Sequence, residues 1–240
     1  MTWLWRIFFS GLGVFPVLAA TLSGSVRLVD SSDPEVHKRG DFSGVVVWIE
    51  PLNGEKPVSG SSSTPHARMV QKDKHFIPHV LAVRTGSIVD FPNYDPIFHN
   101  AFSSFGGQIF DVGLYPPGTT RSVEFRRSGI VHVFCNIHPS MSAVVVVLDT
   151  PWFGVSSRSG AFDIQGVPPG EYRLRVYHER ATRTTLDKLE RRVTLREKGP
   201  VLDAISISET GYVVTPHKNK FGKDYPPADE DNLLYHSGSK

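Results

Sequence analysis

Cysteine is nearly absent from this chain. Cys135 is the only one among 240 residues, and methionine occurs just three times. One thiol cannot form a disulfide within the chain, and it excludes zinc and iron–sulfur sites built from four cysteines. The sequence also lacks the Gly-x-Ser-x-Gly motif of serine hydrolases and a phosphate-binding loop. These absences exclude several common classes of enzyme.

An excess of charge of one sign is missing as well. The chain has 26 Lys and Arg against 24 Asp and Glu, which gives a formal net charge of +2. Such a protein has no large basic field, and this argues against nucleic acid as a partner. The content of 40% hydrophobic and 21% charged residues is typical of a globular protein. The length allows one or two domains.

The main hydrophobic run is too short for a membrane-spanning helix, which needs about 20 apolar residues. It extends from Ile7 to Ala20, follows Arg6, contains Pro16 and ends in small residues. We interpret residues 1–20 as a secretory signal peptide that is cleaved on export to the periplasm. An uncleaved membrane tether is the alternative. After cleavage, contact with a membrane is not expected.

Short strand-like segments make up most of the remaining chain, and they predict an all-β protein. A weak pattern at Thr184–Arg192 allows one short helix, and no longer helix is expected. Residues 57–65 form a Ser-rich crossing, and residues 211–240 are interpreted as an extended or disordered polar tail. The predicted strands are Leu22–Val29, Gly44–Glu50, Val80–Arg84, Ser87–Phe91, Arg121–Arg126, Ile130–Cys135, Ala143–Leu148, Tyr172–Val176, Arg191–Arg196 and Ala204–Ser208.

The single cysteine lies in a segment with further metal-binding residues. Residues 135–141 read Cys-Asn-Ile-His-Pro-Ser-Met, and His99 lies upstream. One thiolate, two imidazoles and one thioether are the ligands of a trigonal copper site with a weak axial methionine. A free thiol in an oxidising compartment needs either burial or a metal. Zinc fits the same residues less well, because methionine is a poor zinc ligand.

The surrounding residues resemble the plastocyanin/amicyanin family of cupredoxins. The resemblance rests on the Cys-x2-His-x2-Met spacing with Pro139 after the histidine, the preceding Gly129-x-Val-x2-Phe-Cys strand, and Asp95 before His99 and Asn100. It covers roughly Met69 to Leu148, and the wider pattern resembles plastocyanin-like accessory proteins of methylamine utilisation. It implies a Greek-key β-sandwich that holds one type 1 copper.

The resemblance also implies a role for particular residues. The copper ligands it implies are His99, Cys135, His138 and, in the axial position, Met141. Asn100 is then expected to tie the two ligand loops together by hydrogen bonds. In that family the edge of the second histidine reaches the surface within an apolar ring. The candidates for this ring are Ile137, Pro139, Phe98 and Phe102.

A second resemblance lies C-terminal to the copper motif. Residues 160–176, with Gly-x-Phe-x-Ile followed by Pro-x-Gly-x-Tyr-x-Leu, are similar to the carboxypeptidase regulatory-like, transthyretin-like β-sandwich. The predicted division is therefore 21–64 as N-terminal strands, 65–148 as the cupredoxin domain and 149–210 as the regulatory-like sandwich. Residues 21–64 either complete the regulatory-like sandwich, with the cupredoxin inserted, or belong to a tandem cupredoxin. The sequence leaves both arrangements open.

The leading hypothesis for function is a periplasmic electron carrier with one copper. Its partners would be redox proteins such as a c-type cytochrome or a periplasmic dehydrogenase, and no small-molecule substrate is expected. The alternative is a copper-handling or interaction protein without long-range electron transfer. Copper enzymes need additional clustered histidines, often His-x-His pairs, and none occurs here. The chain is therefore not expected to be an enzyme.

Overall fold

The computed structural model describes residues 19–54, 64–104, 106–196, 199–213 and 216–225. Within these ranges almost all regular structure is strand, which confirms the all-β prediction. The predicted signal segment lies outside the described residues except for its last two, and so does most of the Ser-rich crossing. No helix in the described part is long and apolar enough to cross a membrane.

The described elements are two short helices and seventeen strands. The helices are α1 (Pro34–Arg39) and α2 (Arg183–Leu189). The strands are β1 (Ala20–Val29), β2 (Val46–Pro51), β3 (His66–Arg68), β4 (Val70–Lys72), β5 (His75–Ile77), β6 (Val80–Arg84), β7 (Ser87–Pro92), β8 (Phe102–Ser103), β9 (Phe110–Asp111), β10 (Thr120–Phe125), β11 (Gly129–Phe134), β12 (Ser142–Leu148), β13 (Phe153–Val155), β14 (Ala161–Val167), β15 (Gly170–Tyr177), β16 (Arg191–Leu195) and β17 (Ile205–Ser208).

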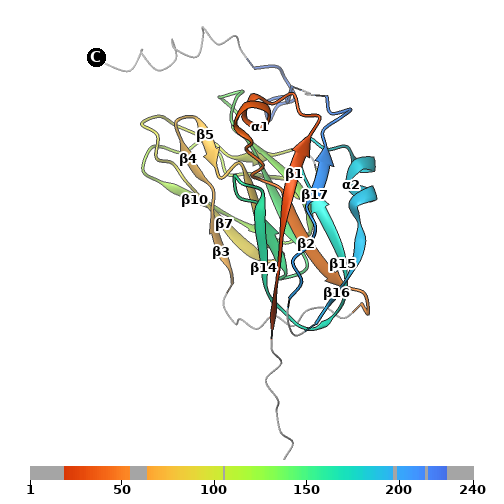
Figure 1. Cartoon of the computed structure of the whole chain (residues 1–240). Helices are drawn as coiled ribbons and strands as arrows, with labels where there is room; N and C mark the ends of the chain where they lie inside the picture. Colours follow the sequence, from red (N-terminus) through yellow and green to blue (C-terminus); the bar gives the residue numbers. More distant parts are fainter. Residues whose placement is uncertain (1–18, 55–63, 105, 197–198, 214–215, 226–240) are drawn as a thin grey trace, which may run out of the picture.

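One sandwich is built from the two ends of the described chain. β1 pairs with β14 and β17 in one sheet, and the second sheet has the order β13-β2-β15-β16. Figure 1 shows β1 and β17 side by side, and they are hydrogen-bonded in parallel although about 180 residues separate them. A single apolar core contains inward residues of both sheets, such as Leu22, Ile49, Leu174 and Ile207. Strands from the N-terminal and C-terminal parts of the described chain therefore share one core.

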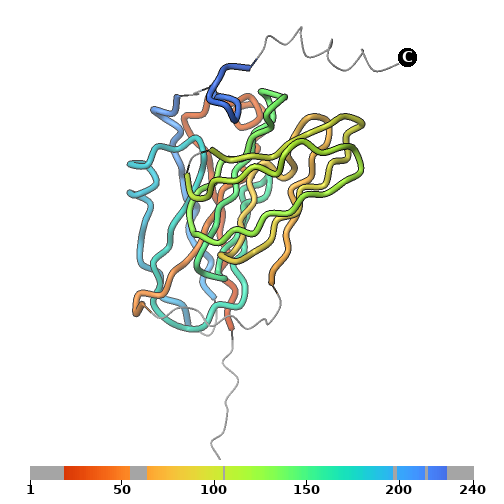
Figure 2. The backbone as a smooth tube through the Cα atoms, turned by 180° about the vertical axis from the view of Figure 1, so that it is seen from behind, coloured from red at the N-terminus to blue at the C-terminus, as the bar shows by residue number. Residues whose placement is uncertain are grey.

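The other sandwich comes from the middle of the chain. Its sheets have the orders β6-β12-β11-β8-β9 and β10-β7-β3, with the β4–β5 hairpin beside them. Figure 2 shows these yellow and green strands gathered on one side of the molecule. A separate core contains Phe91, Phe125, Val131 and Val145. Residues 66–148 thus lie along the chain between the two groups of strands that form the first sandwich.

A third apolar layer joins the two sandwiches. Val46 of β2 and Val144, Val146 and Leu148 of β12 form one buried cluster. Alternate residues of β12, such as Val145, point instead into the core of the central sandwich. Because successive side chains of a strand face opposite sides, β12 is buried on both faces. This explains its continuous apolar sequence, Ala-Val-Val-Val-Val-Leu.

Helix α1 was not predicted, although its end signals are present in the sequence. The Asp33 side chain accepts a hydrogen bond from the Glu35 N–H at 2.9 Å, and Pro34 occupies the first turn. Gly40 ends the helix with φ of 61°, the left-handed conformation that glycine adopts without strain. With six residues and only Val36 buried, α1 has no hydrophobic period to detect. Helix α2 lies close to its predicted position.

Candidate metal centre

Three candidate ligands meet at one end of the central sandwich. Cys135 follows β11, His138 lies in the loop to β12, and His99 precedes β8, where its backbone pairs with Tyr115. The Cys135 Sγ atom is 3.9 Å from His99 Nδ1 and 3.7 Å from His138 Nδ1, and the three ligand atoms lie within 4.8 Å of one another. All three side chains are buried.

This spacing fits a single metal ion. Bonds of about 2.0 Å to nitrogen and 2.3 Å to sulfur, set at about 120°, place the two atoms about 3.7 Å apart. The observed Sγ–Nδ1 distances of 3.7 and 3.9 Å match that separation. One soft thiolate and two imidazoles suit copper or zinc. The site therefore has the donors and the spacing to hold one such ion.

Asp95 orients the His99 ring. The Asp95 carboxylate lies 2.7 Å from His99 Nε2, and it accepts hydrogen bonds from the backbone N–H groups of Asp73 at 2.6 Å and Lys74 at 2.9 Å. Burial opposes ionisation of this carboxyl, but these hydrogen bonds together hold its pKa below the ordinary value. An ionised carboxylate only accepts, so His99 donates through Nε2 and its Nδ1 lone pair faces Cys135.

Burial keeps His99 in the form that a ligand needs. Removal from water lowers the pKa of the His99 imidazole, and the neighbouring Asp95 only partly opposes this shift. The imidazole is therefore neutral at pH 7, and a metal does not have to displace a proton from Nδ1. Asp95 was part of the sequence resemblance, but its contact with His99 became visible only in the structure.

The loop between Cys135 and Met141 is closed by its own backbone. The Cys135 N–H donates to the Met141 carbonyl at 3.1 Å, and the Met141 N–H donates to the His138 carbonyl at 3.1 Å. Met141 is fully buried in the same apolar core as Cys135. The loop thus brings the fourth candidate residue back to the end of the strand on which Cys135 lies.

Asn100 connects the segments that carry the two sets of candidate ligands. Its Oδ1 accepts a hydrogen bond from the Asn136 N–H at 3.0 Å, next to Cys135. Its Nδ2 donates to Asp111 Oδ1 at 2.7 Å and to the Gly113 carbonyl at 3.3 Å. Asn100 itself is only 1% exposed. The Asn100 side chain therefore connects the segment next to His99 with the loop that follows Cys135.

Two expectations about the surface near the site are wrong. His138 does not present an edge to solvent, since the residue is only 2% exposed. Phe102 is buried at 1% exposure and packs against Phe134 with 5.9 Å between ring centroids, so it belongs to the interior. Of the other ring candidates, Phe98 and Pro139 are exposed and Ile137 is partly buried.

The polar tail predicted from residue 211 needs a correction as well. Its described part, which ends at Tyr225, forms neither strand nor helix, but it is packed against the loop of Cys135. Residues 226–240 lie outside the described ranges. The sequence showed only a polar stretch without periodicity, and nothing local in it indicated that it contacts the candidate metal site.

The other histidines of the described ranges do not form a second cluster of this kind. Within the described ranges, His99, Cys135 and His138 are the one group of such side chains close enough to share an ion. His79 instead pairs with Glu179 at 2.8 Å, and this hydrogen bond raises the pKa of His79. His132 lines a cavity of about 1070 Å³ on the outer side of β11, away from Cys135, as strand alternation predicts.

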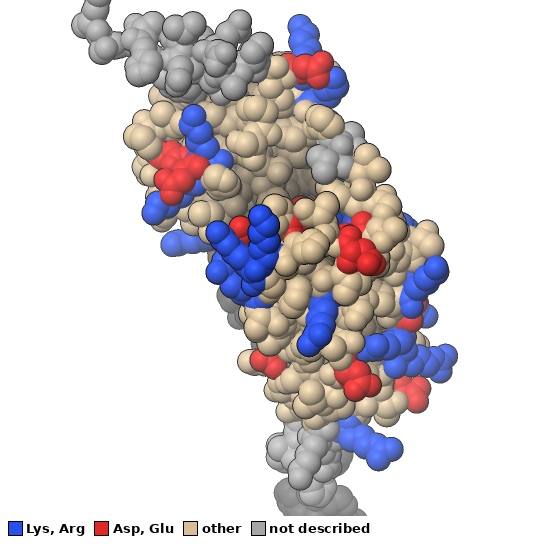
Figure 3. Space-filling model, turned by 45° about the horizontal axis from the view of Figure 1, so that its top comes forward, with Lys and Arg blue, Asp and Glu red and all other residues tan. Residues whose placement is uncertain are grey.

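Charge is interspersed on the surface. Figure 3 shows Lys and Arg beside Asp and Glu across one face of the molecule, with no extended patch of either sign. The composition already predicted this balance. The fold and the site together define an all-β protein of two packed sandwiches, one of which holds a buried His–Cys–His cluster at its end.

Comparison with known proteins gives one curated relative and several structural likenesses. No model of a protein family matches the chain. Methylamine utilization protein MauL of Methylorubrum extorquens is 35% identical over 60 residues, which are 25% of this chain and 53% of that protein. The chain therefore spans about half the length of this relative.

Similar solved structures include a nitrite reductase, a cupredoxin and an amicyanin variant. A Cu-containing nitrite reductase from Thermus scotoductus is 22% identical, over 41% of this chain and 26% of its own, with a TM-score of 0.34. A purple cupredoxin from Nitrosopumilus maritimus is 21% identical, over 34% and 99%, with a TM-score of 0.32. A reduced amicyanin variant is 20% identical, over 36% and 85%, with a TM-score of 0.34.

Proposed function

We propose that this chain is a copper protein that carries single electrons. The observation that supports this most directly is the buried group of His99, Cys135 and His138, with ligand atoms within 4.8 Å of one another. In the proposed site these three residues hold one copper ion, and Met141 is the weak axial ligand. Copper bound there would alternate between Cu(I) and Cu(II), taking up or releasing one electron each time.

The protein matrix suits such a role because it restrains the candidate ligands in advance. Asp95 fixes the His99 ring, and Asn100 joins the two ligand segments by hydrogen bonds. Cys135 and Met141 are joined through the loop backbone. A site held this firmly needs little rearrangement when the charge of the metal changes, which favours fast electron exchange.

The proposal extends to location and partners. We infer that the chain is exported to the periplasm and exchanges electrons there with another redox protein, such as a c-type cytochrome or a dehydrogenase. The relative named for methylamine utilization makes an amine-oxidising system a specific place to search for that partner. We assign no substrate chemistry to the chain itself, so it acts as a carrier and not as an enzyme.

The visible absorption spectrum of the Cu(II)-loaded protein tests this function. We expect an intense blue charge-transfer band from the Cys135 thiolate to copper. The Cys135→Ser variant should lack the band, while Ser142→Ala, an alteration beside the same loop, should keep it. Tight copper binding without the band would contradict the carrier function and favour a copper-handling protein. Failure to bind copper would overturn both.

A further inference from the structure

The described C-terminal segment, residues 216–225, is bonded to the backbone on both sides of His138. The Tyr225 hydroxyl donates to the Cys135 carbonyl at 2.7 Å. His217 Nε2 lies 2.9 Å from the Pro139 carbonyl and therefore donates to it, since a carbonyl only accepts. The two pairs of residues are 90 and 78 positions apart in the sequence. In Figure 2 the segment is the dark blue loop at the top of the molecule.

Lys220 makes a third contact, and it joins the segment to two residues that are hydrogen-bonded to Asn100. The Lys220 N–H donates to Asn136 Oδ1 at 3.0 Å, and the Lys220 ammonium group pairs with Asp111 Oδ2 at 2.8 Å. The other oxygen of Asp111 accepts from Asn100 Nδ2 at 2.7 Å. The segment is thus connected, through Asp111 and Asn136, to Asn100, which ties the two candidate ligand segments together.

Aromatic rings also pack between the segment and the end of β11. The His217 ring stacks on Phe134, the residue before Cys135, with centroids 4.0 Å apart and planes inclined by 23°. Tyr225 meets the His217 ring edge-on at 5.2 Å. These ring contacts and the hydrogen bonds of Tyr225, His217 and Lys220 form only in a particular relative position. Residues 216–225 therefore occupy a defined place on the loop from Cys135 to Met141.

We propose that residues 216–225 form a cap that holds the loop from Cys135 to Met141 and closes the metal centre. Three observations carry this: hydrogen bonds on both sides of His138, the stack on Phe134, and the burial of Cys135 and His138, which are 0% and 2% exposed. The cap must lift before a thiol reagent or a metal acceptor reaches Cys135. The inference rests on the proposed metal site but not on electron transfer.

Alkylation of Cys135 by iodoacetamide in the metal-free, full-length protein tests the cap without any copper. Tyr225→Phe removes one hydroxyl and keeps the ring. Because a net hydrogen bond changes an equilibrium by about fivefold, this variant should be alkylated about fivefold faster than the wild type. Adding His217→Ala removes a second hydrogen bond and the stack, and should accelerate alkylation further.

Tyr212→Phe is the matched control, because Tyr212 also lies beyond β17 but is 40% exposed and outside the cap. It should be alkylated at the wild-type rate.

The dependence of the alkylation rate on low urea concentrations separates local from global opening, since only global unfolding exposes enough surface to respond steeply to urea. A shallow urea response in Tyr225→Phe is expected. A steep response, or wild-type rates in both cap variants, would overturn the proposal.

Transfer of Cu(I) to a bicinchoninate chelator provides the second readout. The cap variants should release copper several-fold faster than the wild type and the Tyr212→Phe control. A blue protein with unchanged release and alkylation rates refutes the cap and leaves the carrier function intact. A colourless protein with accelerated alkylation refutes the carrier function and supports the cap.

Discussion

At the scale of single residues, two polar side chains, Asp95 and Asn100, position the candidate ligands of the metal site by hydrogen bonds. Both side chains are buried and hydrogen-bonded through both of their terminal polar atoms, and each joins backbone segments that are distant in the sequence. Buried polar groups stabilise a fold most when each of them has a hydrogen-bond partner. Removing one leaves its partners buried without a hydrogen bond, which costs their free energy of desolvation. This makes Asn100 a sensitive position at which to test the site.

We predict that Asn100→Ala lowers the free energy of unfolding by about 2 kcal/mol, because the Asn136 N–H and Asp111 lose a buried partner. Copper affinity should fall by about 10–100-fold, as expected when support for the ligands is lost. Urea unfolding of the metal-free protein and chelator competition measure the two effects. Gln108→Ala removes an exposed amide with two hydrogen bonds and should leave copper affinity unchanged.

At the scale of elements, the pairing of β1 with β14 joins the start of the described chain to its C-terminal third. Gly160 lies where these strands meet, with φ of 84°, and its carbonyl accepts from the Val26 N–H at 2.9 Å. A methyl group on Gly160 would lie 2.2 Å from the Val26 carbonyl oxygen. Because that oxygen belongs to the backbone of β1, the strand itself would have to move.

Gly160→Ala should therefore destabilise the protein by about 3 kcal/mol or more, combining left-handed strain with a backbone clash. Gly118→Ala is the control, since Gly118 has φ of 71° but open space around its Cβ position. That change should cost only about 1 kcal/mol, from the left-handed conformation alone. Equal losses in the two variants, measured by urea unfolding, would contradict the packing of β14 on β1.

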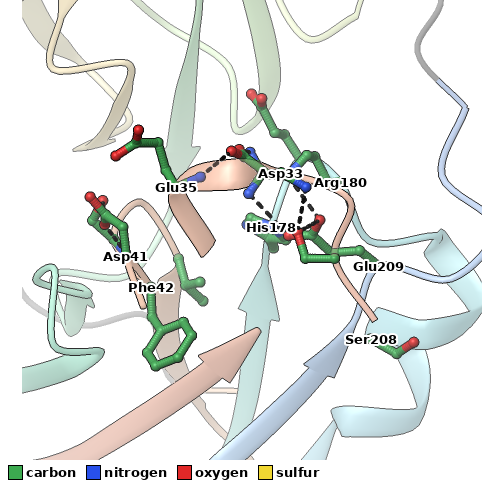
Figure 4. A network of polar contacts seen from close by, with 12 residues as sticks. Asp33, Glu35, Asp41, Phe42, His178, Arg180, Ser208 and Glu209 are labelled. Carbon is green, nitrogen blue, oxygen red and sulfur yellow. Dashed lines mark hydrogen bonds and ion pairs between the residues drawn. The ribbon is translucent and has the colours of Figure 1, made fainter. Parts of the chain in front are cut away.

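At the scale of the whole molecule, a partly buried network of ionisable side chains ties the loop before α1 to the segments that follow β15 and β17. Figure 4 shows His178, Arg180 and Asp33 gathered around Glu209. Glu209, which is 6% exposed, contacts His178 at 2.8 Å and Arg180 at 3.0 Å, and Arg180 also pairs with Asp33 at 3.0 Å. Removing one partner of a buried pair leaves the other charge without compensation.

The pH dependence of stability follows from this network. Burial opposes ionisation of Glu209, but hydrogen bonds from Arg180, Ser31 and His178 hold its pKa below the ordinary value. A lowered carboxyl pKa stabilises the fold above the unfolded value of about 4.3, and this contribution disappears as pH falls through the folded pKa. Burial also lowers the pKa of His178, so acid weakens the fold further below about pH 6.5.

We predict that Glu209→Gln lowers the free energy of unfolding by about 2–4 kcal/mol at pH 7. The difference from the wild type should shrink as pH falls below about 4.3, because first the unfolded and then the native carboxyl becomes protonated. Urea unfolding of the metal-free proteins at pH 7 and pH 3.5 measures both. Glu190→Gln, which breaks contacts of a surface glutamate with Arg173 and Arg175, should cost at most about 1 kcal/mol at either pH. A difference independent of pH would contradict the assignment.

The sequence by itself determined the features that depend on local pattern. Alternation of apolar residues located the main strands, and the spacing of Cys135, His138 and Met141 placed three candidate ligands on one tight loop. His99 was chosen as the upstream histidine of the same ligand set and was also implied by the family resemblance, and the structure brings its Nδ1 to 3.9 Å from the thiol. The apolar alternation and the ligand spacing on the loop are each contained in a short segment of chain, so they can be recognised before the fold is known.

Only the tertiary structure decided which distant segments meet. The period of two that identifies β1 does not specify its neighbours, so the choice of β14 and β17 depends on how the whole core packs. The same holds for Phe102, which is buried by a neighbouring strand, and for Tyr225, which reaches Cys135 across 90 residues. Such contacts are selected by the sum of burial and hydrogen bonding over the folded molecule, and they leave no periodic trace in the segments that make them.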